Sequence, residues 1–420
     1  MANVIRAKWT WTGGRFERDV AVVIDSQGRI ERVERAGAVD LLHHALLPGF
    51  VNAHSHAFQR GLRGTPQRFG TNDNFWSWRE TMYRLAESLD VDRFYETSKR
   101  CFEEMLAAGI TCVGEFHYLH HENSRWALDD AILAAAKDAG IRLVLLQTYY
   151  ATGGIGKPLE GAQLRFGPGS RDEFVRQLDV IAAKLDSKMQ SLGVACHSIR
   201  AAPTEDLVYF RDYARANGNL PFHIHVEEVR QEITDCVAAH GKGPLETLLD
   251  RIHVDDRVTA IHCTHSTPDD LREFTARGGR ICLCPLTEGN LSDGIADVPT
   301  MIDAGGRLCV GSDSNIRLGM TEELRWLEFV QRVARERRGV MTNLIDVGTV
   351  NGAGALGVAC GVIAPGHFAD LFVIDLDHPT MRGCAEPDAI IDSLIYGCGN
   401  EPITQVWVSG VGVSPAHKRL

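Results

Sequence analysis

The chain lacks an apolar run of about 20 residues, which is the length that a helix needs to cross a bilayer. Residues 1–8 also lack the hydrophobic stretch of a secretory signal peptide. We therefore expect a cytoplasmic protein that has no membrane partner.

Positive charge is scarce as well. The chain has 44 Lys and Arg residues against 55 Asp and Glu residues, which gives a net charge of -11. Such a composition offers no general attraction to nucleic acid or to anionic lipid. We therefore expect a small-molecule substrate as the partner, and no nucleic acid.

Paired cysteines are absent. The 11 cysteines are odd in number and scattered along the chain, and no two of them form a Cys-x-x-Cys pair. This pattern argues against a disulfide framework and against a cysteine-based metal site. We interpret the cysteines as buried, reduced thiols.

The composition that remains is that of a globular protein, with 44% hydrophobic residues in a chain of 420. This length has room for one large domain and a smaller one. Short β-like runs occur near both ends of the chain, within residues 20–33 and 369–410. We predict that the two ends, 1–48 and 358–420, form one small β-sandwich domain beside a central domain at 49–357.

The central domain alternates apolar β-rich runs with helical stretches rich in Ala, Leu, Glu and Arg, which is the pattern of parallel βαβ units. The eight strand candidates begin near Leu47, Ile110, Ile141, Gly193, Leu220, Val258, Arg280 and Arg307. Eight such units predict an α/β fold of the closed (β/α)8 TIM-barrel type. In that fold the catalytic groups lie at the C-terminal ends of the strands.

Histidines stand at the ends of the first and the fifth strand candidates. His54 and His56 are two residues apart, so both side chains point to one face of a strand and can reach a single ion. His225 belongs to a second His-x-His sequence, and Glu228 can curl back as a base over a water molecule at such an ion. The other histidine of that sequence, His223, lies deeper in the barrel, and we expect it to be hydrogen-bonded and structural.

Two further candidates end the sixth and the eighth strand runs, where His262 and Asp313 stand. Side chains that can bind a metal or move a proton thus occur at the ends of strands one, five, six and eight. A barrel brings these four ends to one face. The pattern therefore predicts an active site with a bound metal at that face.

Several stretches of the chain resemble the amidohydrolase superfamily and, within it, the deiminases that act on N-formimino-L-glutamate. The matching stretches are spread over nearly the whole chain and lie at residues 54–60, 75–80, 115–118, 197–201, 225–228, 311–314 and 323–328. Several of them are typical of these deiminases rather than of the superfamily at large.

The resemblance implies a zinc site, one ion per chain, held by His54, His56, His225 and Asp313. It implies that the catalytic groups are Glu228, His262 and Asp313. It implies that the substrate is bound by Gln59, Arg79, Tyr118, His197 and Arg200. The implied reaction is the hydrolytic deimination of N-formimino-L-glutamate to N-formyl-L-glutamate and ammonia, a step of histidine degradation, by an enzyme that we expect to form a homodimer.

The implied substrate residues also make chemical sense by themselves. N-formimino-L-glutamate carries two carboxylates, and a protein with a net charge of -11 must supply local cations to bind it. Arg79 and Arg200 offer bidentate forks that suit carboxylates, with Tyr118, Gln59 and His197 as neutral donors. An anionic small molecule is therefore the substrate class that we expect.

Two alternatives remain open. Other enzymes of the superfamily use the same zinc set on purines, pyrimidines and triazines, and these heterocycles do not need paired arginines. A non-catalytic binding homologue would lack a metal ligand or Glu228, and neither is missing here.

The chain departs from the resembled enzymes in a shorter C-terminus and in Val229, where a polar residue is expected. We expect a single metal because residues 197–200 offer no lysine that could bridge two ions.

Overall fold

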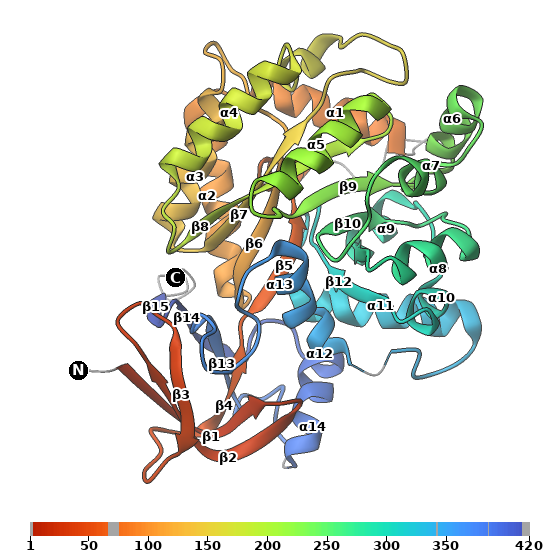
Figure 1. Ribbon diagram of the computed structural model, residues 1–420. Helices are drawn as coiled ribbons and strands as arrows, with labels where there is room; N and C mark the ends of the chain where they lie inside the picture. The colour runs from red at the N-terminus through yellow and green to blue at the C-terminus, as the bar shows by residue number, and fades with distance from the viewer. Residues whose placement is uncertain (1–2, 66–74, 342, 385, 414–420) are drawn as a thin grey trace.

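The computed structural model describes residues 3–65, 75–341, 343–384 and 386–413. Its strands form an eight-stranded sheet in the middle of the chain and a seven-stranded sheet from both ends. The first sheet is the inner wall of a barrel, and the second lies beyond one end of that barrel (Figure 1). No helix in the described ranges is long and apolar enough to span a membrane.

The barrel strands run parallel and follow one another around the sheet in chain order. They are β5 (Phe50–Ser55), β6 (Ile110–His117), β7 (Arg142–Tyr149), β8 (Gln190–Ser198), β9 (Phe222–Val226), β10 (Val258–His262), β11 (Arg280–Leu283) and β12 (Arg307–Val310). Each begins within three residues of its predicted start. The predicted (β/α)8 fold is therefore confirmed.

Helices cover the outside of the barrel. They are α2 (Val91–Ala107), α3 (Ala127–Ala139), α4 (Arg171–Lys184), α5 (Thr204–Ala216), α6 (Arg230–His240), α7 (Pro244–Arg251), α8 (Pro268–Ala276), α9 (Pro285–Leu291), α10 (Val298–Asp303), α11 (Met320–Arg335), α12 (Leu344–Val347) and α13 (Val350–Leu356). The α2 helix begins where the side chain of Asp90 accepts a hydrogen bond from the backbone N–H of Arg93, 2.8 Å away. Its residues Phe94, Phe102 and Met105, spaced by about one or two turns, are buried against the barrel.

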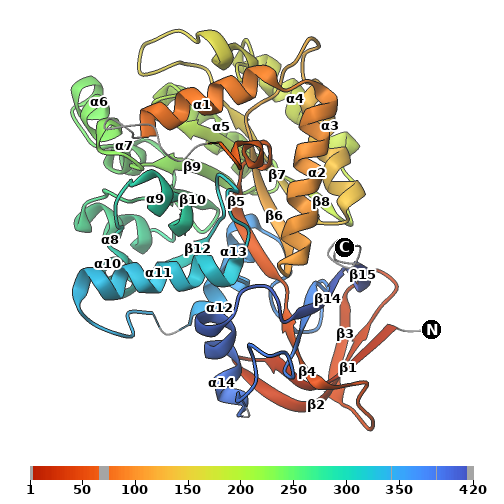
Figure 2. The same ribbon diagram turned by 180° about the vertical axis from the view of Figure 1, so that it is seen from behind.

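Three further segments lie near the C-terminal ends of the barrel strands: the 3-10 helices η1 (Ala57–Leu62) and η2 (Gly161–Arg165), and the helix α1 (Phe75–Ser88). The α1 helix lies across this end of the barrel, opposite the seven-stranded sheet (Figure 2). It therefore covers the face at which a barrel of this kind carries its catalytic groups.

The barrel closes where the first strand meets the segment after the last one. The backbone N–H of His56 donates to the carbonyl oxygen of Asp313 at 2.9 Å, and the N–H of Asp313 donates to that of His54 at 3.0 Å. Gly311 permits this approach, because a Cβ atom there would lie 2.6 Å from the Cβ atom of His54. Closure thus brings three predicted metal ligands together through the backbone itself.

The second sheet joins the two ends of the chain. Its strands are β1 (Asn3–Thr12), β2 (Arg15–Ile24), β3 (Ile30–Arg35), β4 (Leu41–Pro48), β13 (Leu371–Asp375), β14 (Ile403–Val408) and β15 (Val411–Val413). The small β domain predicted from both ends is confirmed, but its strands hydrogen-bond as one mixed sheet rather than as the two sheets of a sandwich. The reason is that β4 pairs with β1 on one side and with β13 on the other. The short helix α14 (Pro387–Asp392) and the π-helical turn η3 (Ser393–Gly397) connect β13 with β14.

A buried ion pair links this sheet to the N-terminal end of the barrel. Arg142, at the start of β7, donates from Nε to Oδ2 of Asp370 at 2.6 Å and from Nη2 to Oδ1 at 3.0 Å. Asp370 also accepts from the backbone N–H of Ser409 at 2.7 Å. The ion pair lies at the N-terminal ends of the barrel strands, away from their C-terminal ends. In barrels of this kind the N-terminal face contributes to stability rather than to catalysis.

Candidate metal centre and substrate pocket

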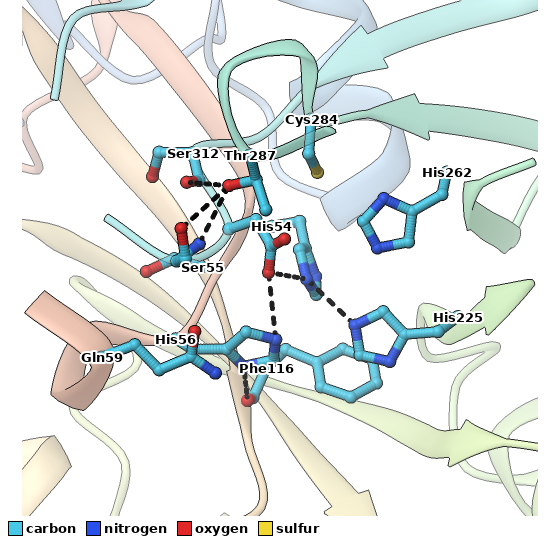
Figure 3. Close-up of polar contacts among 12 residues, drawn as sticks. His54, Ser55, His56, Gln59, Phe116, His225, His262, Cys284, Thr287 and Ser312 are labelled. Atoms are coloured by element: carbon cyan, nitrogen blue, oxygen red, sulfur yellow. Dashed lines mark hydrogen bonds and ion pairs between the residues drawn. The ribbon is translucent and has the colours of Figure 1, made fainter. Parts of the chain in front are cut away.

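Four buried side chains converge at the C-terminal face of the barrel. His54 lies on β5, His56 directly follows β5, His225 lies on β9, and Asp313 follows β12. One ligand atom from each lies within 4.8 Å of the others. Nε2 of His54 lies 3.2 Å from Nε2 of His225 (Figure 3). It also lies 3.2 Å from Oδ1 of Asp313. The structure thus brings together the four residues that the sequence analysis assigned to zinc.

The ring orientations test whether this group fits a cation. Nδ1 of His56 donates to the carbonyl oxygen of Phe116 at 2.9 Å, and Nδ1 of His225 donates to that of His197 at 2.8 Å. These bonds place the ring protons on Nδ1, so the Nε2 lone pairs point inward. Lone pairs that face one another at such short distances favour a cation between them. The four residues therefore fit a bound metal.

The charges of the four side chains suit zinc. Burial lowers the pKa of His54 to about 3 and that of His225 well below its usual value, so both rings are neutral. Burial would raise the pKa of Asp313, but its contacts with His54 and His56 hold it well below its usual value. Three imidazoles and one carboxylate form a nitrogen and oxygen set that zinc accepts.

Glu228 and His262 stand beside this group. Glu228 follows β9 and His262 ends β10, and Oε1 of the glutamate lies 3.7 Å from Nε2 of the histidine. Burial raises the pKa of Glu228 to about 7, although His262 opposes the shift. Burial would lower the pKa of His262, but the carboxylates of Glu228, Glu288 and Asp313 raise it to about 10. One group is thus set to accept protons near neutral pH, and the other stays positively charged.

The backbone is strained where these strands end. Glu227, His262 and Asp313 have φ values of 54°, 74° and 48°, a region that residues other than glycine seldom adopt. Such strain persists only where the surrounding structure holds it, and it concentrates at functional sites. Here it turns the side chains that follow or end β9, β10 and β12 toward the common centre.

A pocket opens over the metal group. It is lined by His56, Gln59, Phe75, Trp78, Arg79, Met82, Tyr83, Tyr118, Tyr150, Phe166, His197, Arg200, His225, Glu228, His262 and Asp313. All five predicted substrate residues and the predicted catalytic groups therefore border the same space. Helix α1 supplies five of the lining residues, so it forms the wall of the pocket that faces the metal group.

Two arginines give this pocket a cationic side. Arg79 on α1 and Arg200 after β8 both lie beside Trp76, with Cζ atoms 4.3 Å and 5.9 Å from the centre of its ring. The Nε atoms of both arginines are buried and have no hydrogen-bond partner among the described residues. A buried donor without a partner is costly, which favours an anionic ligand between them.

The other predicted substrate residues supply neutral polar groups. Nε2 of Gln59 donates to Oη of Tyr118 at 2.9 Å, and that hydroxyl donates to the sulfur of Met82. Oε1 of Gln59 is buried without a hydrogen-bond partner in the described part of the chain. Burial lowers the pKa of His197 well below its usual value, so its ring is neutral. The pocket thus combines two fixed positive charges with uncharged hydrogen-bonding groups.

Comparison with known proteins places this site in a family. A profile described as the amidohydrolase family matches residues 45–413. The chain belongs to the amidohydrolase family. It is a metal-dependent hydrolase that acts on C–N bonds, and its His54, His56, His225 and Asp313 form a group typical of zinc amidohydrolases.

Three individual proteins are similar to this amidohydrolase. A formimidoylglutamate deiminase of Pseudomonas aeruginosa is 36% identical over 415 residues, which cover 94% of this chain and 91% of that one. An amidohydrolase of Brucella melitensis has a structure with a TM-score of 0.90, 33% identity, and coverage of 98% and 94%. An adenosine deaminase of Xanthomonas campestris with bound zinc has a TM-score of 0.83, 25% identity, and coverage of 97% and 92%.

Sequence analysis of the amidohydrolase missed Glu288 as a partner of His262. Oε1 of Glu288 lies 3.3 Å from Nδ1 of His262 and also accepts from the backbone N–H of Cys284 at 2.8 Å. Glu288 lies on α9, directly after β11. The rule that barrel strand ends carry chemistry applies to this seventh strand as well, and applying it there would have found the residue. His223 is hydrogen-bonded as expected, with Nε2 donating to the carbonyl oxygen of Ala355 at 3.0 Å.

Proposed function

We propose that this amidohydrolase converts N-formimino-L-glutamate to N-formyl-L-glutamate and ammonia. The observation that carries the proposal is the pair of arginines, Arg79 and Arg200, which border the same pocket as the metal group. A substrate with two carboxylates and a hydrolysable amidine matches a pocket with cations on one side and a hydrolytic centre on the other. The similarity to a formimidoylglutamate deiminase over most of both chains supports this assignment.

The proposed reaction needs a group that moves protons at the reacting carbon. A zinc ion held by the four ligands would lower the pKa of a water molecule toward about 7. Glu228, beside the metal group and outside the ligand set, accepts the proton of the attacking water and delivers it to the departing nitrogen. Delivery to the terminal nitrogen releases ammonia and leaves the formyl group on the amino acid.

His262 and Asp313 act on the charge that develops at the reacting carbon. The ring of His262 faces the carboxylate of Glu288 with Nδ1, which leaves Nε2 toward Glu228 and the reacting centre. A positively charged ring in this position stabilises negative charge on an oxygen as it forms. Asp313 stays ionised beside His54 and His56, so it supplies a fixed negative charge next to the reacting centre.

One measurement tests the proposal directly. The purified, zinc-loaded protein is incubated with N-formimino-L-glutamate, the released ammonia is assayed, and N-formyl-L-glutamate is identified by mass spectrometry. Purines, pyrimidines and nucleosides serve as the comparison panel at equal concentrations. We expect ammonia release from N-formimino-L-glutamate to exceed that from every member of the panel. Release of free glutamate instead, or faster turnover of a panel compound, would contradict the proposal.

A heterocycle is the second candidate substrate, and the aromatic side chains of the pocket favour it. Phe75, Trp78, Tyr83, Tyr150 and Phe166 line the space above the metal group and could stack against a purine. The similarity to an adenosine deaminase points the same way. The paired arginines have no partner in such a substrate, and for this reason the dicarboxylate is the first choice.

A further inference from the structure

A second group of buried histidines and a carboxylate lies outside the pocket, around Asp129 in the first turn of α3. Its Oδ1 atom accepts from Nε2 of His117 and from Nδ1 of His120, both at 2.9 Å. Its Oδ2 atom accepts from the side-chain amides of Gln147 at 2.7 Å and Gln177 at 2.8 Å. All three members of the His117, His120 and Asp129 group are buried. One carboxylate therefore holds four partners from β6 and the segment after it, β7 and α4.

The hydrogen bonds of this group distinguish it from the metal centre. His120 also donates from Nε2 to the carbonyl oxygen of Thr148 at 2.9 Å, so both of its nitrogens face oxygen acceptors. Two side-chain amide N–H groups donate to the second oxygen of Asp129. A cation beside this oxygen would therefore face hydrogen-bond donors rather than lone pairs. Burial would raise the pKa of Asp129, but His120 and His117 hold it well below its usual value. The group is thus a hydrogen-bond network around an ionised carboxylate, both oxygens of which accept two hydrogen bonds.

The network reaches the metal centre through one short segment of chain. His117 is the residue between Phe116, whose carbonyl oxygen accepts from Nδ1 of His56, and Tyr118, whose hydroxyl lies in the pocket. The rings of Phe116 and Tyr118 both pack against His56, with centroids 5.5 Å and 5.0 Å away. His117 extends the other way, to Asp129. Whatever fixes His117 therefore also fixes the carbonyl group that orients a metal ligand.

We infer that Asp129 is a positioning residue for the metal centre: by holding His117 it fixes the end of β6, and with it the carbonyl oxygen of Phe116 that orients His56. The inference rests on the proposed zinc site. Groups that orient a metal ligand through a hydrogen bond commonly contribute about 10- to 100-fold to metal affinity. Asp129 acts one step further away, through the backbone of β6.

The test compares Asp129→Ala with Asp370→Ala. Both carboxylates are buried and accept several hydrogen bonds, but Asp370 binds Arg142 and Ser409 at the opposite end of the barrel. The dissociation constant for zinc is measured by competition with a chromophoric chelator, and the visible spectrum of the cobalt-substituted protein reports ligand geometry. We expect Asp129→Ala to bind zinc about tenfold or more weakly and to change the cobalt spectrum. We expect Asp370→Ala to lose stability while keeping both properties.

A milder variant keeps the inference testable if Asp129→Ala does not fold. In Asp129→Asn the amide oxygen can still accept from His117 and His120. The amide of Gln147, whose Oε1 atom has no hydrogen-bond partner in the described chain, can turn over to accept from the new NH2 group. We expect a zinc affinity between those of the wild-type protein and Asp129→Ala. Gln177→Ala serves as a matched control on the far side of the carboxylate, where Nε2 of Gln177 donates to Oδ2 of Asp129 at 2.8 Å, and it should leave His117 in place.

Three outcomes would overturn the inference. The first is an Asp129→Ala protein that binds zinc as tightly as the wild type, and the second is an equal loss of affinity in Asp370→Ala. The third is a wild-type protein with two zinc ions per chain, one of which disappears in Asp129→Ala, because the network would then itself be a metal site. Neither readout uses a substrate, so a wrong assignment of the substrate leaves the result standing.

Discussion

In the proposed reaction Glu228 acts on the attacking water and not on the carboxylates of the substrate, so its removal should affect turnover alone. We expect Glu228→Gln to lower kcat by about 100-fold or more, because the amide cannot accept the proton of water. KM and zinc content should stay close to the wild-type values, since the candidate ligands are His54, His56, His225 and Asp313. Steady-state kinetics and metal analysis check this. Retention of more than a tenth of the activity would remove Glu228 from the role of base.

Arg200 should behave in the opposite way. In Arg200→Met a fork to a substrate carboxylate is lost, and we expect about 2–5 kcal/mol of transition-state binding to disappear, seen in kcat/KM. Zinc content should be unaffected. The matched comparison is an N-formimino amino acid without the side-chain carboxylate, assayed in parallel with the dicarboxylate, together with Arg79→Met. If neither arginine variant changes kcat/KM on N-formimino-L-glutamate, the dicarboxylate assignment is wrong, whereas the hydrolase assignment is unaffected.

The pH dependence of kcat/KM should follow Glu228 and His262. Burial raises the pKa of Glu228 to about 7, and the base works only when ionised, so activity should fall as the pH drops through that value. Burial would lower the pKa of His262, but nearby carboxylates raise it to about 10, so activity should fall again as the pH rises through that value. A bound zinc ion lowers both values, so each limb is expected at or below these figures. In His262→Asn the alkaline limb should disappear while the acid limb remains.

The seam between β5 and β12 couples the closure of the barrel to the ligand geometry. In Gly311→Ala the new Cβ atom would lie 2.6 Å from the carbonyl oxygen of His54 and 2.8 Å from its nitrogen, so backbone must move. We expect the free energy of unfolding to fall by about 1–3 kcal/mol and zinc affinity to fall with it. Urea unfolding and zinc titration measure the two effects. Gly37→Ala, where a Cβ atom meets nothing within 4 Å, is the control and should change neither.

The strands and the metal group were predictable from the sequence for one reason. In a parallel barrel all strand ends lie on one face, so His54, His225, His262 and Asp313 could be grouped from their positions after apolar runs. The spacing of His56 from His54 follows from the alternation of a strand. The alternation along a strand and the rule about strand ends were enough to predict the metal group. Neither requires knowledge of which distant residues pair with one another.

The exact pairing of distant segments could not be predicted. The sequence does not show that β4 pairs with β13, and without that pairing the chain ends suggested a sandwich rather than one sheet. The wall formed by α1 follows from how that helix crosses the barrel, and its own periodicity does not reveal this. The network of Asp129 draws on four separate segments, and no local sequence pattern shows that these segments meet.

Loss of the metal should destabilise the whole molecule. The four candidate ligands come from three strand ends that meet only in the closed barrel, so zinc should bind the folded chain and not the unfolded one. Free zinc at about 100 times its dissociation constant should add about 2.7 kcal/mol to the free energy of unfolding. Scanning calorimetry with and without a chelator, beside metal analysis that should give one zinc per chain, checks this. An unchanged unfolding temperature, or a second equivalent of zinc, would contradict it.

The seam between β5 and β12 also determines when the metal centre can form during synthesis of the chain. His54 and Asp313 are 259 positions apart in the sequence. The seven-stranded sheet forms even later, because β4 pairs with β13, which follows Asp313 in the chain. Contacts between such distant residues form late, since the entropy of closing a long loop must be overcome first. A nascent chain that has reached only α9 carries three of the four ligands and no closed barrel to hold them. Zinc uptake should thus mark the closure of the barrel, and a ribosome-bound chain shortened before Asp313 should leave zinc free in solution.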